Sequence, residues 1–187
     1  MANVSRLRVR LAARHLRAGG LLAYPTEAVW GLGCDPLNAA AVDALLALKG
    51  RPQAKGLILA AAEFAQIEPF LDIPSQDMRG RLLDSWPGPV TWIVPAARHA
   101  PTWLAGKRGT LAVRVSAHPV VAALCRAFAG PVISTSANPS GRRPARTLLA
   151  ARRYFPRAGL RFLPGKLGVV GGRPTAIFDA RSGARLR

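Results

Sequence analysis

The sequence has few cysteines and no long apolar run. Its two cysteines, Cys34 and Cys125, lie far apart, so no disulfide framework is indicated. No apolar stretch approaches the ~18 residues that a membrane-spanning helix requires, and no secretory signal is recognisable. These absences favour a cytoplasmic protein without membrane contact.

The usual signatures of metal and nucleotide sites are also missing. His15, His99 and His118 are not spaced as metal ligands, either among themselves or with the cysteines. The segment GLG at 31–33 lacks the third glycine of a dinucleotide fingerprint, and PGKL at 164–167 lacks the Ser or Thr of a P-loop. We therefore expect no protein metal site, and any ATP site must be built without a Walker motif.

Acidic residues are scarce and unevenly placed. The chain has 27 Lys and Arg against 9 Asp and Glu, a net charge of +18, and only four of the 27 are Lys. Eight acids lie between Glu27 and Asp84, and the ninth is Asp179. From Arg142 to Arg187 there are eleven Arg, one Lys and one acid. An Arg-rich genome explains the ratio of Arg to Lys but not the excess over acids. The uneven distribution suggests an anionic partner, a nucleotide or RNA or both, and a merely solvated face stays open as the alternative.

The basic, amphipathic N-terminal segment allows two interpretations. Such a composition is typical of a mitochondrial presequence. However, Leu7, Leu11, Ala12 and Leu16 recur at helical spacing, and an apolar strand follows at once. We favour a first helix of the domain.

Apolar strands and amphipathic helices largely alternate along the 187 residues, which predicts one α/β domain spanning 1–187. A twisted, mixed sheet flanked by helices is the expected architecture. Beyond the first helix, helices are expected at 38–50, 63–71, 76–86, 118–129 and 147–155. Strands are expected at 21–24, 57–60, 91–94, 110–115, 131–133 and 176–178.

Three predicted strand or helix exits are unusually polar. They are the segments PTE at 25–27, KGRPQAKG at 49–56 and STSAN at 134–138. Ligands of α/β sheets bind at such exits, and hydroxyls, an amide and spaced cations suit a phosphate and a carboxylate. Two structural alternatives remain open: the cations can complement a helix C-terminus, and STSAN can form an Asx or ST turn.

Five motifs, in this order, resemble the YrdC family: PTEAVWGLG, KGRPQAKGLIL, WPGPVT, LAVRV and STSANPSG. The resemblance spans nearly the whole chain and fits the short, single-domain branch. It implies a RibB-like α/β fold with a positively charged cleft. The implied activity joins L-threonine, bicarbonate and ATP into threonylcarbamoyl-adenylate and pyrophosphate. Partner transferase proteins then move the threonylcarbamoyl group to tRNA, onto the adenosine beside the anticodon.

The resemblance also implies site residues. Catalytic roles fall on Lys49, Arg51, Ser136 and Asn138. ATP contacts fall on Arg51, Lys55, Thr110, Ser136 and Arg187, and threonine contacts on Thr26, Arg114, Ser134 and Thr175. ATP is expected as a substrate with Mg²⁺, without a tightly bound cofactor. The family often has Thr-Val-Tyr where this chain has Ala-Val-Trp at 28–30, which changes a wall of the site but leaves Thr26 in place.

A second function class stays open at this point: a non-catalytic RNA-binding protein in ribosome or tRNA maturation. Basicity favours it, and the low aromatic content of 6% opposes it, because single-stranded RNA is commonly bound by base stacking. A weak tRNA contact through Arg152, Arg153 and Arg157 is compatible with either class. For Glu27 two roles are open: holding a cleft cation in place, or capping a helix.

Overall fold

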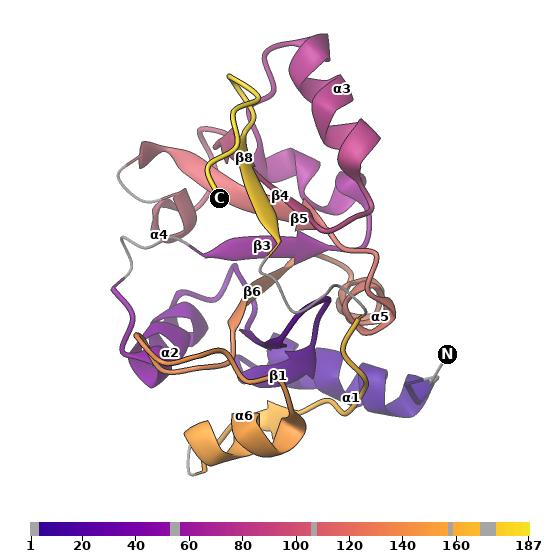
Figure 1. Ribbon diagram of the computed structural model, residues 1–187, viewed down its shortest axis with the longest axis vertical. Coiled ribbons are helices and arrows are strands. Elements are labelled where there is room, and N and C mark those ends of the chain that lie inside the picture. The colour runs from indigo at the N-terminus through magenta and orange to yellow at the C-terminus, as the bar shows by residue number, and fades with distance from the viewer. Residues whose placement is uncertain (1–3, 53–56, 106–107, 157–158, 169–174) are drawn as a thin grey trace.

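Eight strands form one mixed sheet in the computed structural model, which describes residues 4–52, 57–105, 108–156, 159–168 and 175–187 (Figure 1). The strand order is β7-β1-β2-β6-β3-β5-β4-β8. The strands are β1 (Leu22–Pro25), β2 (Trp30–Gly33), β3 (Ile58–Ala61), β4 (Val90–Pro95), β5 (Thr110–Val115), β6 (Val132–Ser136), β7 (Arg161–Phe162) and β8 (Ala176–Asp179). The expected α/β class and mixed sheet are confirmed.

The pairing of the strands explains why the sheet is mixed. β1 and β2 form an antiparallel pair, and β6 lies antiparallel to both β2 and β3. β3 and β5 are parallel, β4 is antiparallel to β5, and the outer strands β7 and β8 are parallel to their neighbours β1 and β4. The sequence did not predict β2 or β7.

β2 was missed because two of its four residues are glycines, which have low strand propensity. The tertiary structure leaves no room for a larger residue at either position. A Cβ on Gly33 would lie 2.2 Å from the carbonyl oxygen of Ile133, and one on Gly31 would lie 2.9 Å from the Thr26 methyl group. Gly33 is therefore fixed by the close approach of another strand rather than by local preference.

β6 is longer than expected. The sequence placed the strand end at residue 133 and treated STSAN as a loop, but the strand continues through Ser136. Ser134 pairs with Ile58, and Ser136 pairs with Gly31. The polar residues remain extended because they lie between two partner strands.

Six α-helices are described: α1 (Arg6–Arg17), α2 (Ala39–Lys49), α3 (Gln76–Ser85), α4 (Thr102–Ala105), α5 (Pro119–Phe128) and α6 (Leu148–Tyr154). The predicted caps of α2 are confirmed. The Asn38 side chain accepts a hydrogen bond from the Ala41 N–H at 3.0 Å, and Gly50 takes a left-handed conformation with φ of 55°. Of the described helices, none is long and apolar enough to span a membrane.

One expected helix is wrong, and the expected first helix is confirmed with a buried face that differs from its leucine spacing. Residues 63–71 form two short 3₁₀ turns, η2 (Phe64–Gln66) and η3 (Glu68–Phe70), instead of an α-helix. Pro69 has no N–H and disfavours helical backbone at the residue before it, which limits the helix to single turns. In α1, Leu7 and Leu11 are 65% and 47% exposed, because the buried stripe is the one formed by Val9, Ala12, Ala13 and Leu16.

The two faces of the sheet are covered unequally. Leu59, Val94 and Val113 point to one face and join a large core with α2 and α3. On the other face, Ala60 and Val132 pack with α1 and α5 in a smaller core. Beyond that smaller core Ile58, Ala112 and Ser134 are only half-buried on this second face, and this is where a ligand can approach the strands.

Candidate functional site

A row of half-buried side chains marks the less covered part of the sheet. Ile58 of β3 pairs with Ala112 of β5 on one side and with Ser134 of β6 on the other. Side chains two residues apart share a face of a strand, so Arg114 lies on the same face as Ala112. A cavity of about 20 Å³ opens here, roughly the space of one water molecule. Its lining comprises Thr26, Glu27, Ile58, Ala60, Arg114, Ser116, Val121 and Ser134.

Arg114 is the centre of a buried polar network beside this cavity. Its Nη1 donates to the Glu27 carboxylate at 3.3 Å, and its Nε and Nη2 donate to the Thr91 hydroxyl at 3.0 and 2.6 Å. Nη2 also donates to the Thr175 hydroxyl. The second carboxylate oxygen of Glu27 accepts a hydrogen bond of 2.5 Å from Ser116. Arg114 is 9% exposed and Glu27 is 6% exposed, so each charge is compensated inside the protein.

This network gives Glu27 a role. Of the two roles left open by the sequence, the structure shows the first: Glu27 holds the cation Arg114 in place. Burial lowers the pKa of Arg114, and the Glu27 carboxylate opposes that shift. Because the guanidinium has five N–H groups and four are used here, one remains for a ligand.

Lys49 forms a second polar centre at the end of α2. Its side chain is 2% exposed, and its ammonium donates to the carbonyl oxygens of Ser136 and of Asn138, the latter at 2.9 Å. The Lys49 carbonyl in turn accepts from the Ser140 N–H at 2.7 Å. Lys49 therefore holds the STSAN segment against α2, a structural role that the sequence did not suggest.

Burial also changes the protonation of Lys49. Burial, and to a lesser extent the nearby Arg51 guanidinium, lower the pKa of the ammonium to about 8. Burial lowers the pKa of Arg51 as well, and this side chain is half-buried. Lys49 and Arg51 are thus two cations close together, with no acid beside them in the sequence.

The structure gathers most of the residues expected to bind threonine. Thr26, Arg114 and Ser134 line one cavity, and Thr175 contacts Arg114 directly. In this structure the Thr26 hydroxyl donates to the Val29 carbonyl at 2.8 Å, which closes the turn between β1 and β2. A ligand must therefore share this hydroxyl with the turn or displace it.

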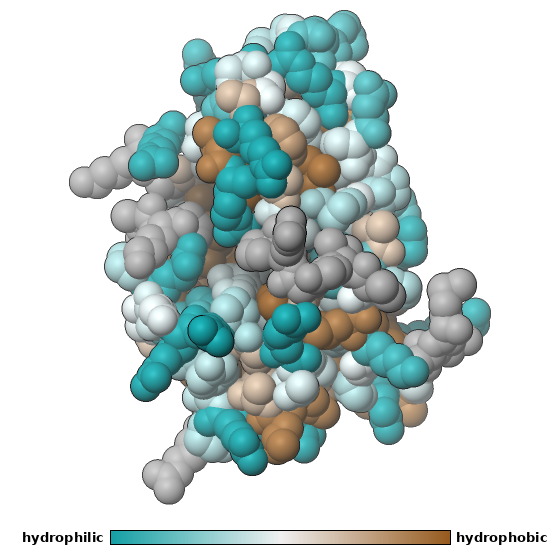
Figure 2. Space-filling model, viewed as in Figure 1, coloured by the Kyte–Doolittle hydropathy of each residue, from teal (hydrophilic) through white to brown (hydrophobic). Residues whose placement is uncertain are grey.

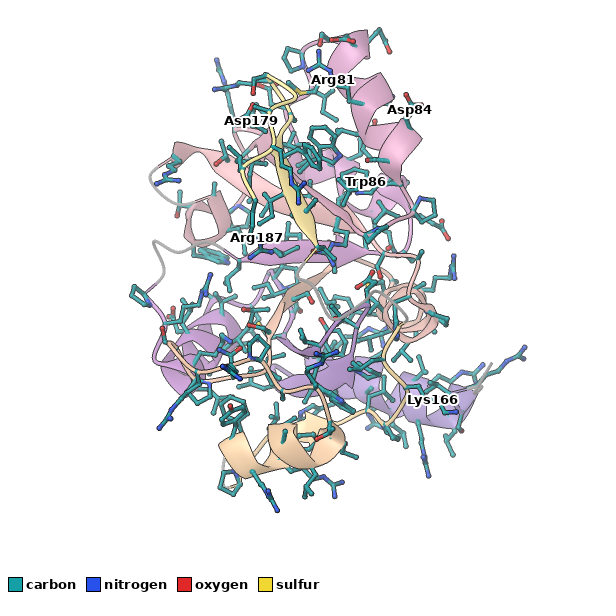
Figure 3. The ribbon with its side chains drawn as sticks, in the orientation of Figure 1. Arg81, Asp84, Trp86, Lys166, Asp179 and Arg187 are labelled. Atoms are coloured by element: carbon teal, nitrogen blue, oxygen red, sulfur yellow. The ribbon has the colours of Figure 1, made fainter. Side chains whose placement is uncertain are left out.

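The residues expected to bind ATP are less closely grouped. Ser136 and Arg51 lie near Lys49, and Thr110 is at the opposite end of β5 from Arg114. The Arg187 guanidinium donates to the Thr175 carbonyl at 3.2 Å, and it is near enough to Arg114 to lower that residue's pKa. Figure 3 shows Arg187 beside β8. Lys55 lies outside the described residues.

Asn138 braces the end of the STSAN segment without forming the expected Asx turn. Its amide nitrogen donates to the carbonyls of Pro139 and Arg142, both at 2.8 Å. These bonds fix the chain directly after β6, but they are not those of an Asx turn, in which the side-chain oxygen accepts from a backbone N–H. The Asn138 Oδ1 is buried and has no hydrogen-bond partner within the described part of the chain.

Three polar residues of the site were not predicted. Thr91 contacts Arg114, and Ser116 contacts Glu27. Thr91 is the last residue of the motif WPGPVT, and Ser116 directly follows the motif LAVRV. The His118 ring nitrogen Nε2 lies 3.1 Å from the Lys166 carbonyl, and burial lowers the His118 pKa. The available signal was strand periodicity, which puts residues two positions apart on one face: Ser116 follows Arg114 by two residues, and Thr91 precedes Ile93 by two.

Metal ligands are not assembled here. The described residues contain no group of three or more His, Cys, Asp or Glu side chains that could hold a metal ion. Glu27, the acid that lines the cavity, is already bonded to Arg114 and Ser116. The donors that this site presents are hydroxyls and cations, which fit an anionic ligand.

The chain resembles known proteins over nearly its full length. The family model Sua5/YciO/YrdC, described as telomere recombination, matches residues 14–186. A threonylcarbamoyl-AMP synthase of Halorhodospira halophila is 59% identical over 180 residues, covering 96% of this chain and 94% of that protein. One of Methylococcus capsulatus is 55% identical over 187 residues, covering all of both chains.

A solved structure shares the fold and contains a ligand. P. abyssi Sua5 complexed with L-threonine is 29% identical, with a TM-score of 0.86. The match covers 95% of this chain and 52% of that one, so this chain spans about half the length of P. abyssi Sua5.

Proposed function

The chain belongs to the Sua5/YciO/YrdC family, and on that premise we propose that it is a threonylcarbamoyl-AMP synthase. It condenses L-threonine, bicarbonate and ATP to threonylcarbamoyl-AMP and pyrophosphate. The names of the full-length relatives favour this enzyme over a non-catalytic RNA-binding protein.

The observation that carries the proposal is the convergence of Thr26, Arg114 and Ser134 on one cavity. An amino acid with a hydroxyl side chain needs a cation for its carboxylate and hydroxyl partners for its side chain. The remaining N–H of Arg114 provides the first, and Thr26 and Ser134 provide the second. The cavity is too small for threonine as it stands, so binding requires these side chains to move apart.

The first chemical step forms a carbamate. The neutral amine of threonine attacks the carbon of bicarbonate, and water leaves. The site contributes position: Arg114 holds the carboxylate, and Glu27 and Thr91 hold Arg114. Ser116 in turn holds Glu27. Orientation of this kind can supply up to ~7–11 kcal/mol of the barrier for joining separate reactants.

The second step transfers the adenylyl group. A carbamate oxygen attacks the α-phosphorus of ATP, and the bond to the pyrophosphate oxygen breaks. Lys49 and Arg51, the two neighbouring cations, neutralise charge on the phosphates. In this structure the Lys49 ammonium donates to two carbonyls, so one of its three N–H groups remains for a contact with a phosphate.

ATP is a substrate here, and Mg²⁺ accompanies it on the triphosphate. Because the described residues assemble no cluster of metal ligands, the phosphates and water supply most of the coordination. The product is a mixed anhydride that water destroys. Downstream tRNA-threonylcarbamoyl transferase proteins are therefore expected to collect it soon after it forms.

The test is pyrophosphate release from ATP by the purified protein, with threonine and bicarbonate omitted in turn. Release that requires both supports the proposal, and a product with the mass of threonylcarbamoyl-AMP identifies the reaction. Release without threonine, or no release by a folded protein, contradicts it.

A further inference from the structure

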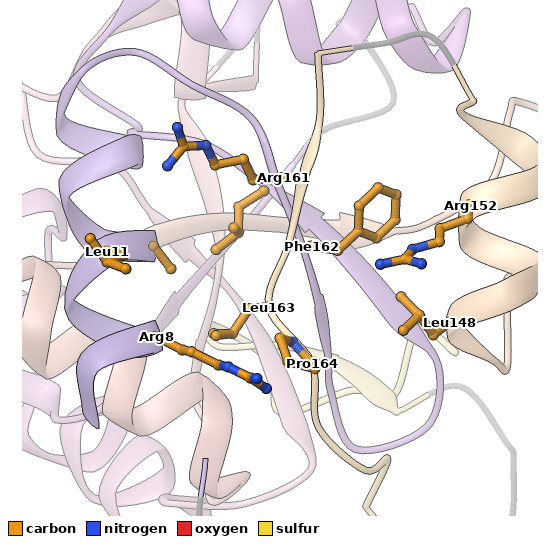
Figure 4. Close-up of a pocket in the computed structure, with 10 residues that line it drawn as sticks. Arg8, Leu11, Leu148, Arg152, Arg161, Phe162, Leu163 and Pro164 are labelled. Atoms are coloured by element: carbon orange, nitrogen blue, oxygen red, sulfur yellow. The ribbon is translucent and has the colours of Figure 1, made fainter. Parts of the chain in front are cut away.

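A second cavity, of about 480 Å³, lies away from the candidate site (Figure 4). It is bounded by α1, α6 and β7, and it shares no lining residue with the cavity around Arg114. Its volume is within the range of sites that hold ligands or side chains of a partner. The catalytic steps above leave this cavity without a role.

The base of this cavity is apolar. Leu22 and Leu163 belong to the core and are nearly inaccessible to solvent, while Leu11 and Phe162 stand at the opening. The same helices carry two further exposed leucines outside the lining: Leu7 on α1 is 65% exposed and Leu149 on α6 is 59% exposed. Figure 2 shows apolar surface around α6 with hydrophilic residues directly beside it.

The charged residues of the lining are all cations: Arg8 of α1, Arg152 of α6 and Arg161 of β7. The sequence places no acid before Glu27 and none between Asp84 and Asp179, so the elements around this cavity contain no carboxylate. None of the three arginines forms an ion pair within the described part of the chain. Arg152 instead lies over the Phe162 ring, 5.4 Å from its centroid.

We propose that this cavity, with its surrounding leucines, is a docking site for an acidic peptide segment of a partner protein that carries large apolar side chains. The leucines and Phe162 take the apolar side chains, and the three arginines pair with carboxylates. An apolar centre with arginine at its edge is the usual composition of a protein–protein contact. The proposal concerns a surface outside the reaction site and does not depend on the proposed function.

Other occupants fit less well. A second copy of this chain would bring a net charge of +18 against an arginine-lined opening, which is repulsive. RNA would supply the negative charge, but it has no large apolar side chains to fill the leucine-rich bottom of the cavity. The one aromatic ring in the lining, on which a nucleobase could stack, is covered by Arg152. The combination of apolar base and unpaired cations selects an acidic, apolar peptide.

The experiment is a fluorescence anisotropy titration of the full chain with a labelled peptide of alternating glutamate and leucine. Two control peptides have leucine replaced by serine, or glutamate replaced by lysine. We expect the glutamate–leucine peptide to bind at least about tenfold more tightly than either control. Leu11→Glu and Arg161→Glu should each weaken its binding by about tenfold or more.

Matched variants separate this site from general charge. Arg98→Glu makes the same charge change at an exposed turn, and Leu37→Glu replaces an exposed leucine elsewhere; both should bind the peptide like the wild type. Thermal unfolding confirms that each variant is folded. No binding by the wild type, equal binding of the serine peptide, or equal loss in Arg98→Glu overturns the proposal. So does displacement of the peptide by an RNA oligonucleotide or by anionic vesicles, or a dimer in sedimentation that Leu11→Glu dissolves.

Discussion

Arginine occupies two contrasting environments in this protein, as Arg114 and Arg161 show. Arg114 is buried, bonded through Nε and both Nη atoms, and paired with Glu27. Arg161 is exposed at the edge strand β7, on a face whose elements carry no acid. The first guanidinium has a fixed position, and the second is free to meet a partner.

The difference follows from solvent. A buried guanidinium without partners would be strongly destabilising, so the fold surrounds Arg114 with a carboxylate and two hydroxyls. An exposed guanidinium is hydrated by water and needs no partner from the protein. Fixed geometry is what a reaction requires, whereas a set of exposed like charges provides attraction over a distance without fixing a position. The following predictions test this contrast, from the largest expected effect to the smallest.

Replacing the buried arginine should have the largest effect. Arg114→Met leaves the Glu27 carboxylate buried without its cation, which is expected to lower the free energy of unfolding by about 3–5 kcal/mol. It also removes the partner of the threonine carboxylate, so kcat/KM for threonine should fall by about 10²–10³-fold. Denaturant titration and pyrophosphate release measure the two effects. A folded variant with a normal KM for threonine would remove Arg114 from the threonine site.

Neutralising the partner of Arg114 should have an intermediate effect. In Glu27→Gln the guanidinium keeps its hydroxyl partners but loses the charge that orients it, so KM for threonine should rise by about tenfold, or ~1.4 kcal/mol, while KM for ATP changes little.

The matched control is Glu63→Gln, which breaks the exposed ion pair with Arg126. Exposed pairs contribute about 0–1 kcal/mol, so stability and both KM values should stay close to the wild type. Equal effects of the two substitutions on KM for threonine would show that burial of the Glu27 pair is irrelevant to binding.

Lys49 should produce opposite pH dependences of stability and of turnover. Because its pKa is about 8 in the folded chain and 10.5 ordinarily, the unfolded chain binds more protons between these values. The free energy of unfolding therefore contains a contribution that rises from about pH 8 to about pH 10.5, and is lost as pH falls through 8. Lys49→Met should lack this rise, which denaturant titrations across that range can measure.

Turnover should respond in the other direction. If the Lys49 charge neutralises phosphate, kcat falls as the ammonium loses its proton above about pH 8, even though the protein becomes more stable. A kcat that stays constant from pH 7 to 9.5, with Lys49→Met equally active, would leave Lys49 with only the structural role of holding Ser136 and Asn138.

The smallest effect is expected at the exposed arginine. Within the residues that the structure describes, the Arg161 side chain forms no hydrogen bond that fixes another side chain. Arg161→Glu should therefore change the free energy of unfolding by no more than about 0.5 kcal/mol. Pyrophosphate release should be unchanged, because Arg161 lies outside the reaction site. A loss of threonine-dependent activity in this variant would show that the two regions are coupled.

Much of the fold could be predicted because the pattern of apolar residues is local. The caps of α2 at Asn38 and Gly50 and the alternation in β5 are visible within a few residues. The failures have local causes as well. The glycines hid β2, the hydroxyls of Ser134 to Ser136 resembled a loop, and the apolar residues at 63–71 suggested a helix that Pro69 prevents.

For the site, the sequence by itself determined which residue types were available: the motifs identified Thr26, Arg114 and Ser134 and the family that uses them. Only the tertiary structure decided how they are held. Glu27 and Arg114 are 87 positions apart, as are Lys49 and Ser136, and no local pattern connects them. The physical reason is burial: once the sheet brings these side chains together out of water, each charge must find a partner, and which partner it finds depends on strand order and register.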